Sequence, residues 1–123
     1  MKKILVILIL LFPFSANAAD SYTNFSLNSL KNTKASGKTI VINSYEPWCW
    51  SCRKQDKVLI GAKNEFKDVV FLTFQQGKNK DIADFLNISV RTTIVVFKGK
   101  KEVARIIGQT SKQEIYSAIK KGI

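Results

Sequence analysis

Runs of apolar residues along this chain predict strands and helices in turn. β-branched or apolar runs predict four strands, at residues 39–45, 69–74, 93–97 and 102–107. Apolar residues spaced three and four apart predict a helix after each of the first two strands and another at the end of the chain. A short helix that ends near Gly37 is expected before the first strand.

The predicted order of elements is therefore α, β, α, β, α, β, β, α. Strands that alternate with helices favour a parallel sheet that is covered on both faces. The last two strands are separated only by the turn from Lys98 to Lys101, so they form a hairpin that adds an antiparallel edge. We expect one α/β domain with a central mixed β-sheet of about four strands flanked by helices.

The first 18 residues have the layout of a secretory signal peptide. Two lysines precede an apolar run over residues 4–14, and Ala-Asn-Ala at 16–18 fits a cleavage site. The run is well short of the ~20 residues that span a bilayer, which favours cleavage after Ala18 over an uncleaved anchor. We expect a single mature domain of residues 19–123 that acts in the periplasm or otherwise outside the cytoplasm.

The chain is strongly basic, with a net charge of +11 that becomes +9 without the two N-terminal lysines. Its basic residues are scattered, which is typical of solvated faces and also suits an acidic partner or an anionic membrane surface. Nucleic-acid binding is not expected, because the N-terminal segment predicts export. The chain has no histidine, which excludes histidine-based acid–base catalysis and the commonest zinc ligand.

Cys49 and Cys52 are the candidate chemical groups, at the junction of a predicted strand and a predicted helix. A bridge across so small a ring is a poor structural staple, so the pair is better suited to redox chemistry. The helix N-terminus would stabilise a Cys49 thiolate, while Cys52, less exposed, would resolve the mixed disulfide. An inert bridge and a metal site are the alternatives, although two thiolates alone do not complete a tetrahedral zinc site.

Two segments carry a resemblance to the thioredoxin family. TIVINSYEPWCWSCRK at 39–54 resembles the family's strand, Trp-Cys-x-x-Cys site and helix. LNISVRTTIVVFKGKKEV at 86–103 resembles its later strand pair, and Gly108 matches the glycine after the last strand. The resemblance implies a thioredoxin-like fold and an enzyme that exchanges disulfides with protein thiols and disulfides. It implies no cofactor beyond a redox-active Cys49–Cys52 disulfide.

Within the family, the site is similar to that of exported bacterial members, which implies a monomer that a membrane-embedded thiol reductase could supply with electrons. The substrate-binding residues that follow from the resemblance are Trp48, Trp50, Arg91 and Thr92. The two tryptophans flank the first cysteine and form a candidate apolar platform for a partner chain, although simple packing would also explain Trp48.

Two positions depart from the family pattern. Thr92 stands where the family usually has a cis-proline, and we expect a trans peptide there because a cis bond before another residue costs about 2.5–4 kcal/mol. That proline keeps metal away from the cysteines in the family, so Thr92 leaves a metal or iron–sulfur site open. Asn43 replaces a buried aspartate and cannot accept a proton from Cys52, while Glu46 is expected on a solvated loop.

A reducing role is favoured over an oxidising one. Strong oxidants of the family often carry histidine between the cysteines, which stabilises the reduced thiolate, whereas here the intervening residues are Trp50 and Ser51. The alternatives are a non-catalytic thioredoxin-like binding module and a metal- or iron–sulfur-binding variant.

Overall fold

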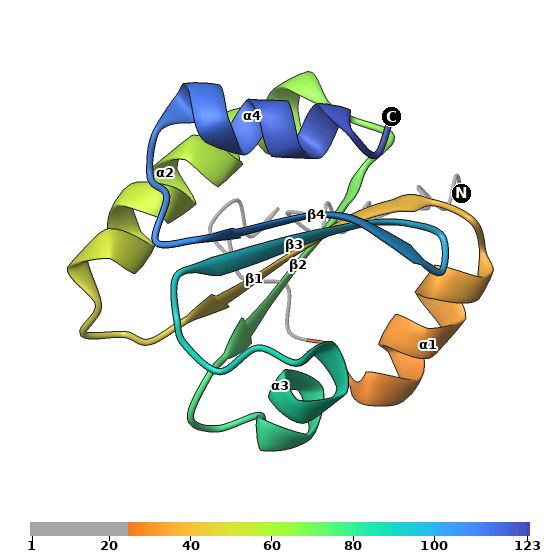
Figure 1. Ribbon diagram of the computed structural model, residues 1–123, viewed down its shortest axis with the longest axis horizontal. Helices are drawn as coiled ribbons and strands as arrows, with labels where there is room; N and C mark the ends of the chain where they lie inside the picture. The colour runs from red at the N-terminus through yellow and green to blue at the C-terminus, as the bar shows by residue number, and fades with distance from the viewer. Residues whose placement is uncertain (1–24) are drawn as a thin grey trace, which may run out of the picture.

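The computed structural model describes residues 25–123, and the expected signal peptide and its cleavage site lie outside the described residues. The eight predicted elements are present in the predicted order (Figure 1). They are α1 (Leu27–Ala35), β1 (Thr39–Tyr45), α2 (Trp50–Glu65), β2 (Val70–Gln75), α3 (Lys80–Leu86), β3 (Thr93–Lys98), β4 (Lys101–Ile107) and α4 (Lys112–Lys120).

The strands form one mixed sheet in the order β2-β1-β3-β4, which confirms the predicted fold class. The more detailed expectation, a parallel sheet with antiparallel pairing only at its edge, is wrong. β1 and β2 are parallel, but β3 runs antiparallel to β1 in the centre of the sheet. The reason is that α3 has only seven residues and rises about 10 Å, so it does not carry the chain back along the sheet. β3 therefore begins beside the carboxyl end of β1, where Ile94 is paired with Asn43.

Helices cover both faces of the sheet, with α2 and α4 on one face and α1 and α3 on the other (Figure 1). Ile40 and Ile42 of β1 contribute to the core beneath α1 and α3, whereas Val41 contributes to the core beneath α2 and α4. This division follows from the alternation of side chains along a strand. Burial on both faces also explains why β1 is almost continuously apolar and β-branched from Thr39 to Ile42.

Side-chain caps define where helices begin. Ser26 and Ser29 form a reciprocal capping box at the start of α1. At the start of α4, the hydroxyl of Ser111 accepts a hydrogen bond from the Glu114 amide, which is the serine half of a capping box. Within residues 25–123, none of the helices combines the length and the apolar composition that a membrane span requires.

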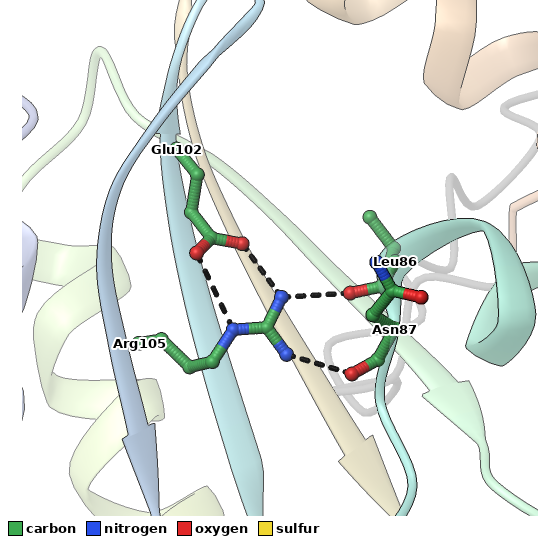
Figure 2. A network of polar contacts seen from close by, with 4 residues as sticks. All are labelled: Leu86, Asn87, Glu102 and Arg105. Atoms are coloured by element: carbon green, nitrogen blue, oxygen red, sulfur yellow. Dashed lines mark hydrogen bonds and ion pairs between the residues drawn. The ribbon is translucent and has the colours of Figure 1, made fainter.

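The end of α3 is tied to β4 by Arg105, as Figure 2 shows. Its guanidinium donates to the carbonyl oxygens of Leu86 at 2.7 Å and Asn87 at 2.9 Å, and it forms an ion pair with Glu102 at 2.6 Å. Asn87 ends the helix with a left-handed φ of 53°, a conformation that asparagine tolerates better than most residues. Arg105 thereby fixes the point from which the chain leaves α3 toward Thr92.

Candidate active site

The two cysteines lie where β1 gives way to α2 and are joined by a disulfide bond. Cys49 is the N-cap residue of α2, with extended backbone angles, and its Sγ accepts a hydrogen bond from the Cys52 amide at 3.2 Å. Pro47 lies in the turn between β1 and α2 and disfavours helical backbone angles at Glu46. The arrangement confirms the predicted strand–motif–helix context, with Cys49 at the positive end of the helix dipole.

Both cysteines are buried in this disulfide-bonded form. The exposed fractions are 2% for Cys49 and 3% for Cys52, so the expectation that Cys52 would be clearly less exposed is wrong for this state. The Sγ of Cys49 lies 3.4 Å from the Ser51 hydroxyl and 3.3 Å from the Thr92 hydroxyl, so two hydroxyls lie against the buried sulfur.

Thr92 has a trans peptide, as predicted, because no peptide bond within residues 25–123 is cis. Its φ of 63° lies in the left-handed region, which is unusual for a β-branched residue. Both main-chain groups have partners inside the domain. The amide donates to the Ser44 carbonyl at 2.9 Å, and the carbonyl accepts from the Gly108 amide at 2.9 Å. Thr92 therefore contacts the cysteines through its side chain.

The Thr92 hydroxyl is the hub of the polar contacts around the disulfide. Its Oγ1 lies 3.3 Å from Cys49 Sγ, 3.1 Å from Cys52 Sγ and 2.9 Å from the Ser51 hydroxyl. The family resemblance alone placed Thr92 at the site, at the position of the cis-proline. The direct contact with both sulfurs depends on the left-handed backbone, which the sequence does not reveal.

Gln55 is a site residue that the sequence motifs did not indicate. It is fully buried, and its Nε2 donates to the Thr92 carbonyl at 3.2 Å and to the Gln109 carbonyl at 2.9 Å. It therefore ties α2 to the segment before β3 and to the segment after β4. One signal was available, because Gln55 follows Cys52 by three residues and precedes Leu59 by four, on the buried face of the helix.

The predicted partner-binding side chains lie at the surface beside the buried sulfurs. Trp48 and Trp50 expose 66% and 71% of their surface. The Arg91 guanidinium stacks over the Trp48 ring, 4.3 Å from its centre, so the structure brings together two predicted residues from separate segments. Trp50 lies on the first turn of α2, with the Lys54 ammonium 5.8 Å from its ring. Exposed tryptophan and arginine are the side chains that most often anchor protein interfaces.

Asn43, at the position of the family's aspartate, and Glu46, the nearest acidic residue in the sequence, both have structural partners. Asn43 is buried, and its side-chain oxygen accepts a hydrogen bond from the Thr73 hydroxyl. Glu46 accepts from the Gly77 amide at 2.6 Å and from the Gln75 side chain at 3.1 Å. Glu46 lies in the loop after β1, as expected, and its carboxylate braces the end of β2.

The resolved electrostatic perturbation among residues 25–123 lies outside the site. Burial lowers the pKa of Lys63, near the far end of α2, and the nearby Asp56 carboxylate partly opposes this shift. In the same part of the chain, no three or more of the residue types His, Cys, Asp and Glu are grouped so that they could hold a metal ion.

The geometry defines a class of protein: a domain with a redox-active disulfide at a helix N-terminus, which can pass between disulfide and dithiol. The sequence model of the family described as Thioredoxin matches residues 18–121, and the chain belongs to that family. It is a thioredoxin-like thiol–disulfide oxidoreductase that exchanges disulfides with protein partners. Its chemistry uses the Cys49–Cys52 disulfide and no cofactor.

Curated proteins that are similar to this chain include thioredoxins. The chain is 31% identical to Thioredoxin H2 of Arabidopsis thaliana over 88 residues, covering 72% of this chain and 65% of that protein. It is also 31% identical to Thioredoxin of Mycoplasma genitalium over 90 residues, covering 73% of this chain and 88% of that protein. Oxidised mitochondrial thioredoxin 3 of Saccharomyces cerevisiae has a similar structure, with a TM-score of 0.73, 25% identity, and coverage of 81% and 94% of the two chains.

Proposed function

We propose that this protein is exported and reduces disulfides in partner proteins outside the cytoplasm, with a membrane-embedded thiol reductase as its electron donor. The reducing direction is supported by the absence of charged groups among the polar atoms that contact the two sulfurs in the described residues. Within residues 25–123, the polar atoms that contact Cys49 and Cys52 are the hydroxyls of Ser51 and Thr92 and a main-chain amide. Strong oxidants stabilise the reduced thiolate with a neighbouring positive charge, and neutral hydroxyls do so less.

The reduction potential of the pair tests this direction. Equilibration with glutathione buffers is expected to give a potential in the range of reducing thioredoxins and glutaredoxins, below about −200 mV. A potential near −120 mV, at the strong-oxidant end of the scale, would refute the reducing role. Insulin reduction by the wild type, with Cys49→Ser as the inactive control, confirms that the measured pair is the working one.

Export is supported by the pattern of the first 18 residues: a basic start, an apolar run and small residues before the cleavage point. Expression of the full chain in a bacterium is expected to yield periplasmic protein whose first residue is Ala19. An Ala18→Phe variant places a bulky residue at the cleavage point and is expected to keep its N-terminal segment. Recovery of the wild type only from the cytoplasm, with Met1 or Lys2 at its start, would contradict export.

The partner surface is proposed to be the exposed pair Trp48 and Trp50 together with Arg91, on a basic domain that favours acidic partners. Cys52→Ala removes the resolving sulfur, so partners should remain attached to Cys49 as mixed disulfides. The double variant Cys49→Ala/Cys52→Ala is the matched control and should retain none. Equal recovery of proteins by both variants would refute capture through Cys49. We further propose that the domain acts as a monomer, which light scattering would check.

A further inference from the structure

We propose that the hydroxyl of Thr92 is a catalytic hydrogen-bond donor to the Cys49 thiolate, and that Gln55 is the positioning residue that holds it there. The inference rests on the oxidoreductase chemistry but not on its direction or its cellular location. Thr92 Oγ1 lies within hydrogen-bond reach of both sulfurs, at 3.3 Å from Cys49 and 3.1 Å from Cys52. In the dithiol form the same hydroxyl therefore lies between the nucleophile and the resolving thiol.

The count of hydrogens, together with the shorter contact of the Ser51 hydroxyl with Thr92 Oγ1 (2.9 Å) than with Cys49 Sγ (3.4 Å), favours one arrangement in the reduced site. Ser51, Thr92 and the Cys52 thiol each have one hydrogen to donate, whereas a Cys49 thiolate has none. Ser51 and Cys52 can both donate to Thr92 Oγ1, which has two acceptor lone pairs, and Thr92 then donates its own hydrogen to the Cys49 thiolate. A hydrogen bond to a charged sulfur is stronger than one to a neutral sulfur, so the network favours the thiolate.

Charged side chains of the surrounding segments are directed elsewhere. Each has a partner other than the sulfurs, and these pairs are Glu46 with Gly77, Arg53 with Pro47, Lys54 with Trp50, Asp56 with Lys63, and Arg91 with Trp48. Beyond the helix N-terminus, the side chains within hydrogen-bond reach of Cys49 Sγ are therefore the Ser51 and Thr92 hydroxyls.

The position of the hydroxyl depends on backbone contacts. A threonine with a φ of 63° occupies a sparsely populated region and persists only where its surroundings hold it. Here the Thr92 amide is held by Ser44, and its carbonyl is held by Gly108 and by the buried Gln55 side chain. Proline has no amide hydrogen and could not make the first of these contacts. The left-handed backbone conformation of Thr92 therefore sets the position of its hydroxyl.

The reaction balances without any added group. The Cys49 thiolate attacks one sulfur of a partner disulfide, a new S–S bond forms, and the other partner sulfur leaves as a thiolate that takes a proton from water. Cys52 then loses its proton to solvent and attacks Cys49 Sγ, and the second partner sulfur leaves and is protonated. Two electrons pass to the partner, while Cys49 and Cys52 become the disulfide. Thr92 acts in the first step as a donor to the nucleophile, and in the second it accepts the S–H of Cys52 until that proton is lost.

Three variants of the full-length protein test the role of Thr92. Thr92→Val keeps the shape and the β-branch but removes the hydroxyl, and Thr92→Ser keeps the hydroxyl. Thr93→Val makes the same chemical change one residue on, where the hydroxyl donates to the Val90 carbonyl and not to a sulfur. The readouts are the pH midpoint for alkylation of Cys49 by iodoacetamide and the equilibrium constant for reduction by dithiothreitol. Far-UV circular dichroism verifies that each variant is folded.

Thr92→Val is expected to raise the midpoint and to lower the equilibrium constant for its own reduction about tenfold, which corresponds to a potential about 30 mV more negative. Thr92→Ser and Thr93→Val are expected to stay close to the wild type in both readouts. Equal shifts for Thr92→Val and Thr92→Ser, or no shift for Thr92→Val, would overturn the proposal. Gln55→Met keeps the Thr92 hydroxyl but removes the hydrogen bond that holds the Thr92 carbonyl. The pH midpoint for Cys49 alkylation should therefore rise less in Gln55→Met than in Thr92→Val. A wild-type protein that reduces insulin while Thr92→Val is unshifted would refute the role of Thr92 and leave the enzyme function intact.

Discussion

Replacing Gln55 with glutamate places a titratable group where the structure provides only acceptors. The Gln55 side chain is fully buried, and its Nε2 donates to two carbonyl oxygens, those of Thr92 and Gln109. A protonated glutamate can satisfy one of these carbonyls, so Gln55→Glu is expected to lose about 1 kcal/mol of unfolding free energy at pH 4, the usual net value of one hydrogen bond. An ionised glutamate can satisfy neither carbonyl and would carry a buried, unpaired charge.

The penalty should therefore grow with pH. Burial and two facing carbonyls raise the pKa of this carboxyl in the folded state above its unfolded value of about 4.3, so the folded state retains a proton that the unfolded state releases. Stability consequently falls as pH rises from about 4 to the folded-state pKa. A shift of two to three pH units corresponds to a further loss of about 3–4 kcal/mol at pH 8, a large share of the roughly 5–15 kcal/mol typical of a domain.

Urea unfolding at pH 4, 6 and 8 measures this loss. Gln113→Glu is the matched control, because Gln113 is exposed on α4 and the same change there should alter stability by less than about 0.5 kcal/mol. Gln55→Met removes both donors without adding a charge. It also removes the buried Oε1, which has no hydrogen-bond partner among residues 25–123, so its loss should be moderate and independent of pH. An equal penalty for Gln55→Glu at pH 4 and pH 8 would refute the reasoning.

Two further predictions concern braces near the site. Arg105→Lys loses the planar guanidinium that contacts the Leu86 and Asn87 carbonyls and Glu102, so urea unfolding should show a loss of about 1–2 kcal/mol of unfolding free energy. Glu102→Gln removes only a partly exposed ion pair and should lower the unfolding free energy by less than about 1 kcal/mol. A larger loss for Glu102→Gln than for Arg105→Lys would be inconsistent with the network in Figure 2. Glu46→Gln weakens the charged hydrogen bond from the Gly77 amide and should lower the unfolding free energy by about 1 kcal/mol. The pH profile of insulin reduction should stay unchanged. A shifted profile would instead identify Glu46 as a proton acceptor.

The helices and strands could be predicted because each of them follows from the conformational preference and apolar spacing of its own residues. The β-branched run at the start of β1 and the apolar spacing in α2 each correspond to an observed element. The direction of β3 could not be predicted in this way. It depends on how far α3 and the following segment carry the chain, which is a property of three-dimensional path length and not of the apolar pattern.

The chemistry of the site is readable from the order of residues: two cysteines at the spacing of a redox pair, placed between a buried strand and a helix. What surrounds their sulfurs depends on how the chain folds. Thr92 and Gln55 are 40 and 3 residues from Cys52 along the chain, yet both belong to the same network at the disulfide. The physical reason is that hydrogen bonds to a buried sulfur depend on positions set by β1, α2 and β3 together. A left-handed threonine backbone, held from three sides, has no signature in the order of residues.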